Sequence, residues 1–104
     1  MTYAEARQLL EELEQLAIGG GWKDERAARD FRAKCGRLAA AAHHSYTHEK
    51  IGNAQSWAEI LFSARKHARW DSGGRPGHEA VRGFLFNDLE RIRMWLSKDP
   101  GFTA

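Results

Sequence analysis

The chain has 104 residues, enough for one domain built around a single hydrophobic core. Its apolar runs are far shorter than the roughly 20 residues of a bilayer-spanning helix, and no secretory signal pattern opens the sequence. A single cysteine, Cys35, excludes an internal disulfide, so we expect a cytoplasmic domain spanning residues 1–104 with no membrane partner. Net charge is +2, but residues 1–18 carry −3 and the remainder +5, an asymmetry that bears on partners.

A first helix is predicted from Thr2 to the glycine run at residues 19–21. Thr2 and Glu5 have the spacing of a capping box, in which hydroxyl and carboxylate satisfy amides of the first turn. Glycine tolerates the left-handed conformation that ends many helices, so the glycine run is the expected terminus. The expected buried stripe has helical spacing and consists of Ala6, Leu9, Leu10, Leu13, Leu16 and Ala17.

A second helix is predicted from Asp24 to about Tyr46. Gly36 inside it costs about 1 kcal/mol relative to alanine, which we attribute to the close approach of a neighbouring helix. Residues 47–53, which include Gly52, are predicted to form a connection. The apolar face of this second helix is expected to contain Ala27, Ala28, Phe31, Cys35, Leu38, Ala39 and Ala42.

A third helix is predicted to begin at Asn53 or Ser56 and to continue to about Trp70. Its apolar residues recur in steps of three and four, a seam that packs against another helix. Residues 71–77 are rich in glycine and contain a proline, so they are predicted to form a loop. The seam consists of Ala54, Trp57, Leu61, Ala64 and Ala68.

A fourth helix is predicted from His78 to Ser97, before the helix-stopping residues 99–101. Its core stripe is expected to be Val81, Leu85, Leu89, Ile92 and Leu96, broadened by Phe84 and Trp95. No stretch has the alternating pattern of a strand, and connections of this length favour antiparallel neighbours. The sequence therefore predicts an all-α protein, a compact antiparallel four-helix bundle.

Cationic side chains are concentrated in the stretch SARKHARW, residues 63–70. Arg65 and Arg69 are one helical turn apart, and five basic residues face two acidic ones between Arg65 and Arg82. Arginine binds phosphate oxygens through two parallel hydrogen bonds, and an indole stacks on bases. A second arginine-rich segment at residues 26–37 strengthens the prediction of a polyanion-binding surface, because such binding needs several phosphate contacts. The predicted nucleic-acid-binding residues are Arg29, Arg32, Arg37, Arg65, Lys66, Arg69, Trp70, Arg75 and Arg82.

These residues predict binding to RNA or single-stranded DNA through the phosphate backbone, without strong sequence preference. A simpler alternative is a solvated basic face that only keeps the protein soluble, with Trp70 covering the core. Another alternative is a protein–protein interaction module, such as a phage-type inhibitor or an assembly adaptor. Such a module would use the same arginines against an acidic partner, with Trp22 or Trp70 as an anchor.

Catalytic and metal-binding patterns are weak. His44 and His48 have the i, i+4 spacing of some zinc sites, but Ser45 stands where the zincin pattern has glutamate, and a third ligand would have to be His67 or His78. The sequence lacks a glycine-flanked nucleophilic serine and a phosphate-binding loop, and Cys35 lies on the predicted core stripe. We expect no enzyme, no metal and no cofactor, and a small metalloprotein using the two histidines is the remaining alternative.

The stretch KIGNAQSWAEIL, Lys50 to Leu61, is similar to a glycine-containing helix start found in small subunits of CRISPR effector ribonucleoprotein complexes. The chain also resembles these subunits in size, helicity and basic character. The resemblance implies a non-catalytic subunit in antiviral defence that packs on copies of itself and on other subunits. It also implies that arginine and lysine hold nucleic acid. The acidic first segment departs from this pattern and is interpreted as a docking site for a basic neighbour, giving a head-to-tail contact between copies.

Overall fold

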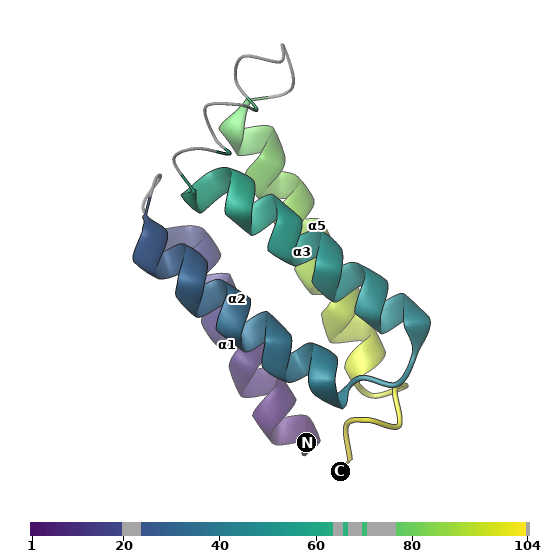
Figure 1. Ribbon diagram of the computed structural model, residues 1–104. Coiled ribbons are helices and arrows are strands. Elements are labelled where there is room, and N and C mark those ends of the chain that lie inside the picture. The colour runs from purple at the N-terminus through teal and green to yellow at the C-terminus, as the bar shows by residue number, and fades with distance from the viewer. Residues whose placement is uncertain (20–23, 64–65, 67–69, 71–76, 104) are drawn as a thin grey trace.

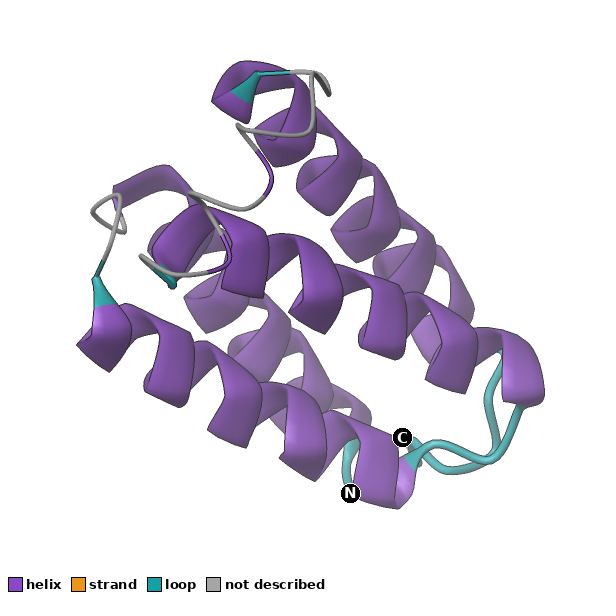
Figure 2. Cartoon of the chain, turned by 45° about the horizontal axis from the view of Figure 1, so that its top comes forward, coloured by secondary structure: helices purple, strands orange, loops and turns teal. Residues whose placement is uncertain are grey.

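The chain folds into an antiparallel helical bundle in the computed structural model. Among the residues that the structure describes, the helices with defined bounds are α1 (Tyr3–Gly19), α2 (Glu25–Ala41), α3 (Ser45–Phe62) and α5 (His78–Leu96) (Figure 1). The helices run alternately up and down, and each packs against two others in the ring α1–α2–α3–α5 (Figure 2). This arrangement confirms the predicted all-α four-helix bundle. The structure describes residues 1–19, 24–63, 66, 70 and 77–103.

The starts of α1 and α2 follow from local sequence, as predicted. The Thr2 hydroxyl accepts a hydrogen bond from the Glu5 amide at 3.1 Å. The Asp24 carboxylate accepts from the amides of Arg26 and Ala27 at 3.1 and 3.0 Å. Each cap satisfies amides that a helix leaves without an internal partner, and so fixes where the helix begins.

One hydrophobic core fills the centre of the bundle. The rings of Phe31 and Phe62 lie 6.1 Å apart, and each is 1% exposed. The core stripes predicted for the first and fourth helices are buried, except that Leu16 is half-buried. Phe84, predicted to broaden the core, is 41% exposed, so that prediction was wrong.

A buried polar contact joins α3 to α5. The indole N–H of Trp57 donates to a carboxylate oxygen of Asp88 at 2.8 Å, and Lys50 Nζ lies 3.9 Å from the other oxygen. Burial raises the pKa of Asp88, and the hydrogen bond from Trp57 opposes this shift. Trp57, predicted in the core seam, is half-buried and contributes this contact at the edge of the core.

The boundary between α2 and α3 differs from the prediction. The second helix ends at Ala41 rather than near Tyr46, and residues 47–53 lie inside α3 rather than in a connection. Ala42 is extended, with φ −66° and ψ 141°, and His44 is the N-terminal cap residue of α3. The proposed helix start at Asn53 or Ser56 was therefore wrong, and KIGNAQSWAEIL lies within one continuous helix.

Asp99 stabilises this boundary. Its carboxylate accepts hydrogen bonds from the backbone amides of His43 at 2.9 Å, His44 at 3.1 Å and Gly101 at 2.8 Å. Burial alone would raise the pKa of Asp99, but these three amides outweigh it and lower the pKa to about 2, with Thr47 adding a smaller effect. Because these amides bond to Asp99, the chain turns at residues 42–44 and begins a new helix there.

The rest of the C-terminal segment completes what we call the C-terminal clasp, residues 99–103. A Cβ on Gly101 would lie 1.8 Å from the carbonyl oxygen of Ala41, so only glycine fits against the end of α2. Phe102 is buried at 6% exposure. The Thr103 amide donates to the carbonyl of Met1 at 3.0 Å, which joins the two terminal segments in a short parallel bridge.

Two further sequence interpretations can be compared with the structure. A Cβ on Gly36 would meet nothing within 4 Å, so the close helix approach expected there was wrong. Within the described residues, every helix is too short or too polar to cross a lipid bilayer.

Candidate nucleic-acid interface

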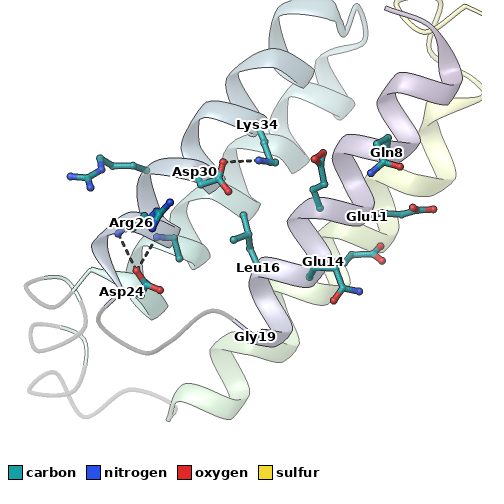
Figure 3. Close-up of a pocket in the computed structure, with 13 residues that line it drawn as sticks. Gln8, Glu11, Glu14, Leu16, Gly19, Asp24, Arg26, Asp30 and Lys34 are labelled. Atoms are coloured by element: carbon teal, nitrogen blue, oxygen red, sulfur yellow. Dashed lines mark hydrogen bonds and ion pairs between the residues drawn. The ribbon is translucent and has the colours of Figure 1, made fainter.

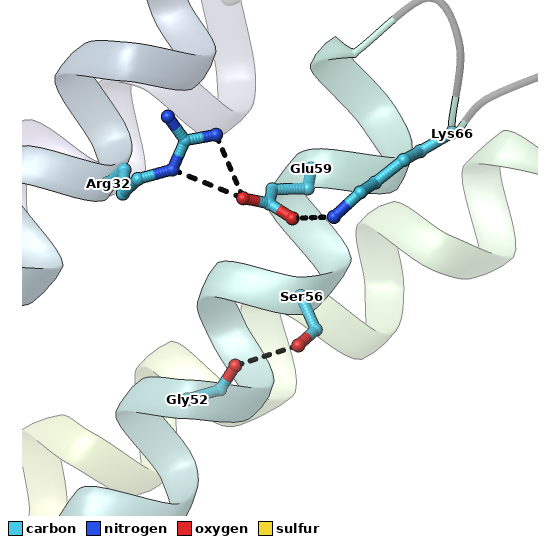
Figure 4. Close-up of polar contacts among 5 residues, drawn as sticks. All are labelled: Arg32, Gly52, Ser56, Glu59 and Lys66. Atoms are coloured by element: carbon cyan, nitrogen blue, oxygen red, sulfur yellow. Dashed lines mark hydrogen bonds and ion pairs between the residues drawn. The ribbon is translucent and has the colours of Figure 1, made fainter.

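Two predicted site residues from distant parts of the sequence meet at one carboxylate. The Arg32 guanidinium on α2 donates to Glu59 Oε1 through Nη2 at 2.9 Å and through Nε at 3.2 Å. Lys66, which follows α3, donates to the other oxygen of Glu59 (Figure 4). The side chains of Arg32 and Lys66 are 50% and 54% exposed, whereas that of Glu59 is 16% exposed. The carboxylate therefore holds two exposed cations together at the surface.

The charge balance at this point is positive. The hydrogen bond from Lys66 is the main cause of a lowered pKa at Glu59. Burial opposes this shift, and Arg32 lowers the pKa further. Glu59 consequently stays ionised at neutral pH and neutralises only one of its two partners. A pair of cations sharing one carboxylate leaves one positive charge at the surface for an outside anion.

Arg29 extends this positive region. It lies three residues before Arg32, so the two side chains leave neighbouring positions on the same side of α2. Arg29 is exposed and forms no ion pair with any described residue. We call Arg29, Arg32, Glu59 and Lys66 the basic patch, which carries three cations against one carboxylate.

Two other predicted arginines lie outside the basic patch. Arg37 is exposed on α2 but points about 140° away from Arg32 around the helix axis at 100° per residue. Arg82 on α5 donates to the carbonyl of Ala17 at the end of α1, and lies 3.7 Å from Glu79. In the structure Arg82 therefore satisfies a helix C-terminus and joins two helices, and its part in nucleic-acid binding stays a prediction.

Trp70, predicted to stack on a base, packs against the edge of the core. Its ring lies 5.9 Å from that of Trp57 in an edge-on arrangement, and it is half-buried against the core. Trp57 in turn lies 5.1 Å from Phe84. This packing supports the alternative in which Trp70 covers the core, and it leaves less of the ring available for stacking on a base.

The remaining predicted residues, Arg65, Arg69 and Arg75, lie outside the described residues. So does Trp22, the other aromatic considered as a partner anchor. Glu59 is the site residue that the sequence did not single out. Its only local signal is the spacing of seven residues to Lys66, two helical turns in a continuous helix. The link to Arg32 depends on the packing of α2 against α3 and has no signature in sequence.

His44 and His48 have structural contacts, and Cys35 is buried. The His48 ring nitrogen Nε2 is 2.7 Å from the carbonyl oxygen of Ala42, and the His44 ring lies edge-on to Trp95 at 5.7 Å. Within the described part of the chain, no group of three acidic, histidine or cysteine side chains is placed to hold a metal ion. Burial raises the pKa of Cys35 to about 12, so this thiol is not an activated nucleophile.

Comparison with known proteins found no matching family model, no similar curated protein and no similar solved structure.

Proposed function

We propose that the chain is a non-catalytic accessory subunit of a cytoplasmic ribonucleoprotein complex of the CRISPR effector kind. It binds the phosphate backbone of RNA or single-stranded DNA through the basic patch, without strong sequence preference. The observation that supports this proposal is the meeting of Arg32 and Lys66 at Glu59, near Arg29, which forms no ion pair with a described residue. Arg32 and Lys66 share one carboxylate and the exposed Arg29 lies one turn away on α2, so two positive charges of the basic patch remain available to phosphates.

The contacts of these cations suit exchange with an outside anion. Exposed ion pairs contribute only about 0–1 kcal/mol each, because water and salt screen them. One of the two exposed cations can therefore turn from Glu59 to a phosphate oxygen while the other keeps the 16% exposed carboxylate paired, and arginine then makes the two-pronged contact typical of phosphate recognition. Arg65, Arg69 and Arg75 add further positive charge to the same stretch of sequence as Lys66.

The test is binding of a fluorescent single-stranded oligonucleotide by a triple variant, Arg29→Gln, Arg32→Gln and Lys66→Gln. We expect affinity at low salt to fall at least tenfold and to a similar extent for unrelated sequences, because phosphate contacts carry no sequence information. The matched control removes three cations elsewhere: Arg7→Gln, Arg91→Gln and Lys98→Gln.

The control has the same net charge as the triple variant, so it separates a located interface from a general effect of charge. Equal losses in the two variants would show that the basic patch is not the binding site. Absence of any oligonucleotide binding by the wild-type protein would exclude nucleic acid as the partner and favour an acidic protein. Circular dichroism and thermal unfolding of both variants establish that each remains folded.

A further inference from the structure

The α1–α2 face of the bundle contains an open groove of about 1120 Å³. These two helices make the least extensive contact of the four neighbouring pairs, so the space between them is open to solvent (Figure 3). Half-buried Leu16 and buried Ala27 form its floor, and polar side chains form its walls. An elongated groove between two helices is a shape that can receive another helix.

The two walls of the groove carry opposite charges. The α1 wall carries Glu11 and Glu12, and the α2 wall carries Arg26, Arg29 and Lys34. No ion pair joins α1 to α2 among the described residues, so this complementarity is not used within the chain. Glu14, the other acid of the α1 wall, instead pairs with Arg93 on α5.

The two acids on the α2 wall do not cancel its positive charge towards a partner. Asp24 is the N-terminal cap of α2 and accepts its first amides. Asp30 lies 2.6 Å from Lys34, one turn away on the same helix, and the Asp30 side chain is 47% exposed. The Lys34 side chain is itself 18% exposed but lines the groove, where a carboxylate of another chain can share it with Asp30.

We infer that the α1–α2 face binds the same face of a second copy of this chain, with a two-fold axis parallel to the helices. This axis exchanges left and right across the face, so α1 of each copy lies against α2 of the other. The acidic wall then meets the basic wall twice in one closed interface. The other in-plane axis, perpendicular to the helices, places α1 on α1 and α2 on α2, and like charges then repel.

The size of the face sets the expected strength of the dimer. Helices of 17 residues are about 25 Å long, and two of them side by side are about 20 Å wide. An interface of this footprint lies at the small end of specific complexes, so we expect a weak dimer that dissociates in the micromolar range. Because opposite charges provide much of the attraction, added salt should weaken it.

Arg29 of the basic patch also lines the groove, so the test changes only Arg26 and Lys34 on the α2 wall and leaves the basic patch intact. The experiment uses two charge-reversed proteins and sedimentation velocity in low salt. One variant carries Glu11→Lys and Glu12→Lys, so both of its walls are basic. The other carries Arg26→Glu and Lys34→Glu, so both of its walls are acidic. We expect the wild-type protein to dimerise and each variant alone to be monomeric.

Mixing the two variants is the decisive step. The basic walls of one variant match the acidic walls of the other, so the mixture should form a heterodimer at least as strong as the wild-type dimer. Wild-type protein that stays monomeric up to about 1 mM would overturn the inference and leave the groove to a different chain. Variants that dimerise alone, or a mixture that does not associate, would also overturn it. Helical circular dichroism of each variant shows that loss of association is not loss of folding.

Discussion

Charge serves different purposes at the two ends of the bundle. In the C-terminal clasp, Asp99 is 2% exposed and bonds to three backbone amides that have fixed positions in the fold. In the basic patch, by contrast, Glu59 bonds to the ends of two long side chains that are about half exposed. A buried carboxylate held by backbone groups determines structure, whereas exposed cations can change partners at small cost. The clasp is thus where substitution should unfold the protein, and the basic patch is where it should change binding.

The largest effect is expected at Gly101, where the chain passes closest to the end of α2. In Gly101→Ala, the new Cβ would lie 1.8 Å from the carbonyl oxygen of Ala41, so the clasp must move away from the bundle. We expect the free energy of unfolding to fall by about 3 kcal/mol, measured by urea denaturation.

Gly36→Ala is the matched control, because nothing lies within 4 Å of its Cβ position in the middle of α2. This substitution should raise stability by about 0.5–1 kcal/mol, since alanine favours a helix more than glycine does. A small effect of Gly101→Ala, comparable to that of ordinary surface substitutions, would contradict the proposed role of the clasp.

A smaller effect is expected for Asp99→Asn, and it should depend on pH. The pKa of Asp99 is about 2 in the folded protein and 3.8 as its ordinary value. A lowered pKa means that ionised Asp99 stabilises the fold above about pH 4, and that this contribution disappears as pH falls towards 2. The difference corresponds to about 2 kcal/mol at neutral pH.

Urea denaturation of wild type and Asp99→Asn at pH 7, 4 and 2.5 measures this dependence. The stability difference between the two proteins should be greatest at pH 7 and should shrink between pH 4 and 2.5. A difference that stays constant over this range would show that the charge of Asp99 does not stabilise the α2–α3 boundary.

Contacts between residues close in sequence could be predicted, whereas contacts between residues far apart in sequence could not. The caps at Thr2 and Asp24 lie within three residues of the amides they bind, so local patterns place the starts of α1 and α2 correctly. The break at residues 42–44 depends on Asp99, more than fifty residues away, and the run of alanines before it is compatible with a continuing helix. Gly52 then suggested a connection where the structure has a helix, because a single glycine is tolerated inside one.

The candidate site shows the same limit. The sequence identifies Arg29, Arg32 and Lys66 as cations, but the meeting of Arg32 and Lys66 at Glu59 depends on the packing of α2 against α3. Arg82 and Trp70 have the same chemistry as binding residues, and only their contacts with Ala17 and Trp57 reveal their structural roles. Residue type therefore predicts which side chains are able to bind an anion, and tertiary contacts determine which of them are available.

The most direct test of nucleic-acid binding is the salt dependence of oligonucleotide affinity for the wild-type protein. If the three cations of the basic patch each contact a phosphate of a single strand, the logarithm of the binding constant should fall with the logarithm of salt concentration. The expected slope is about −2, or steeper if cations outside the patch also contact phosphates. A slope near zero would mean that phosphates are not displacing ions from these side chains and would contradict the account.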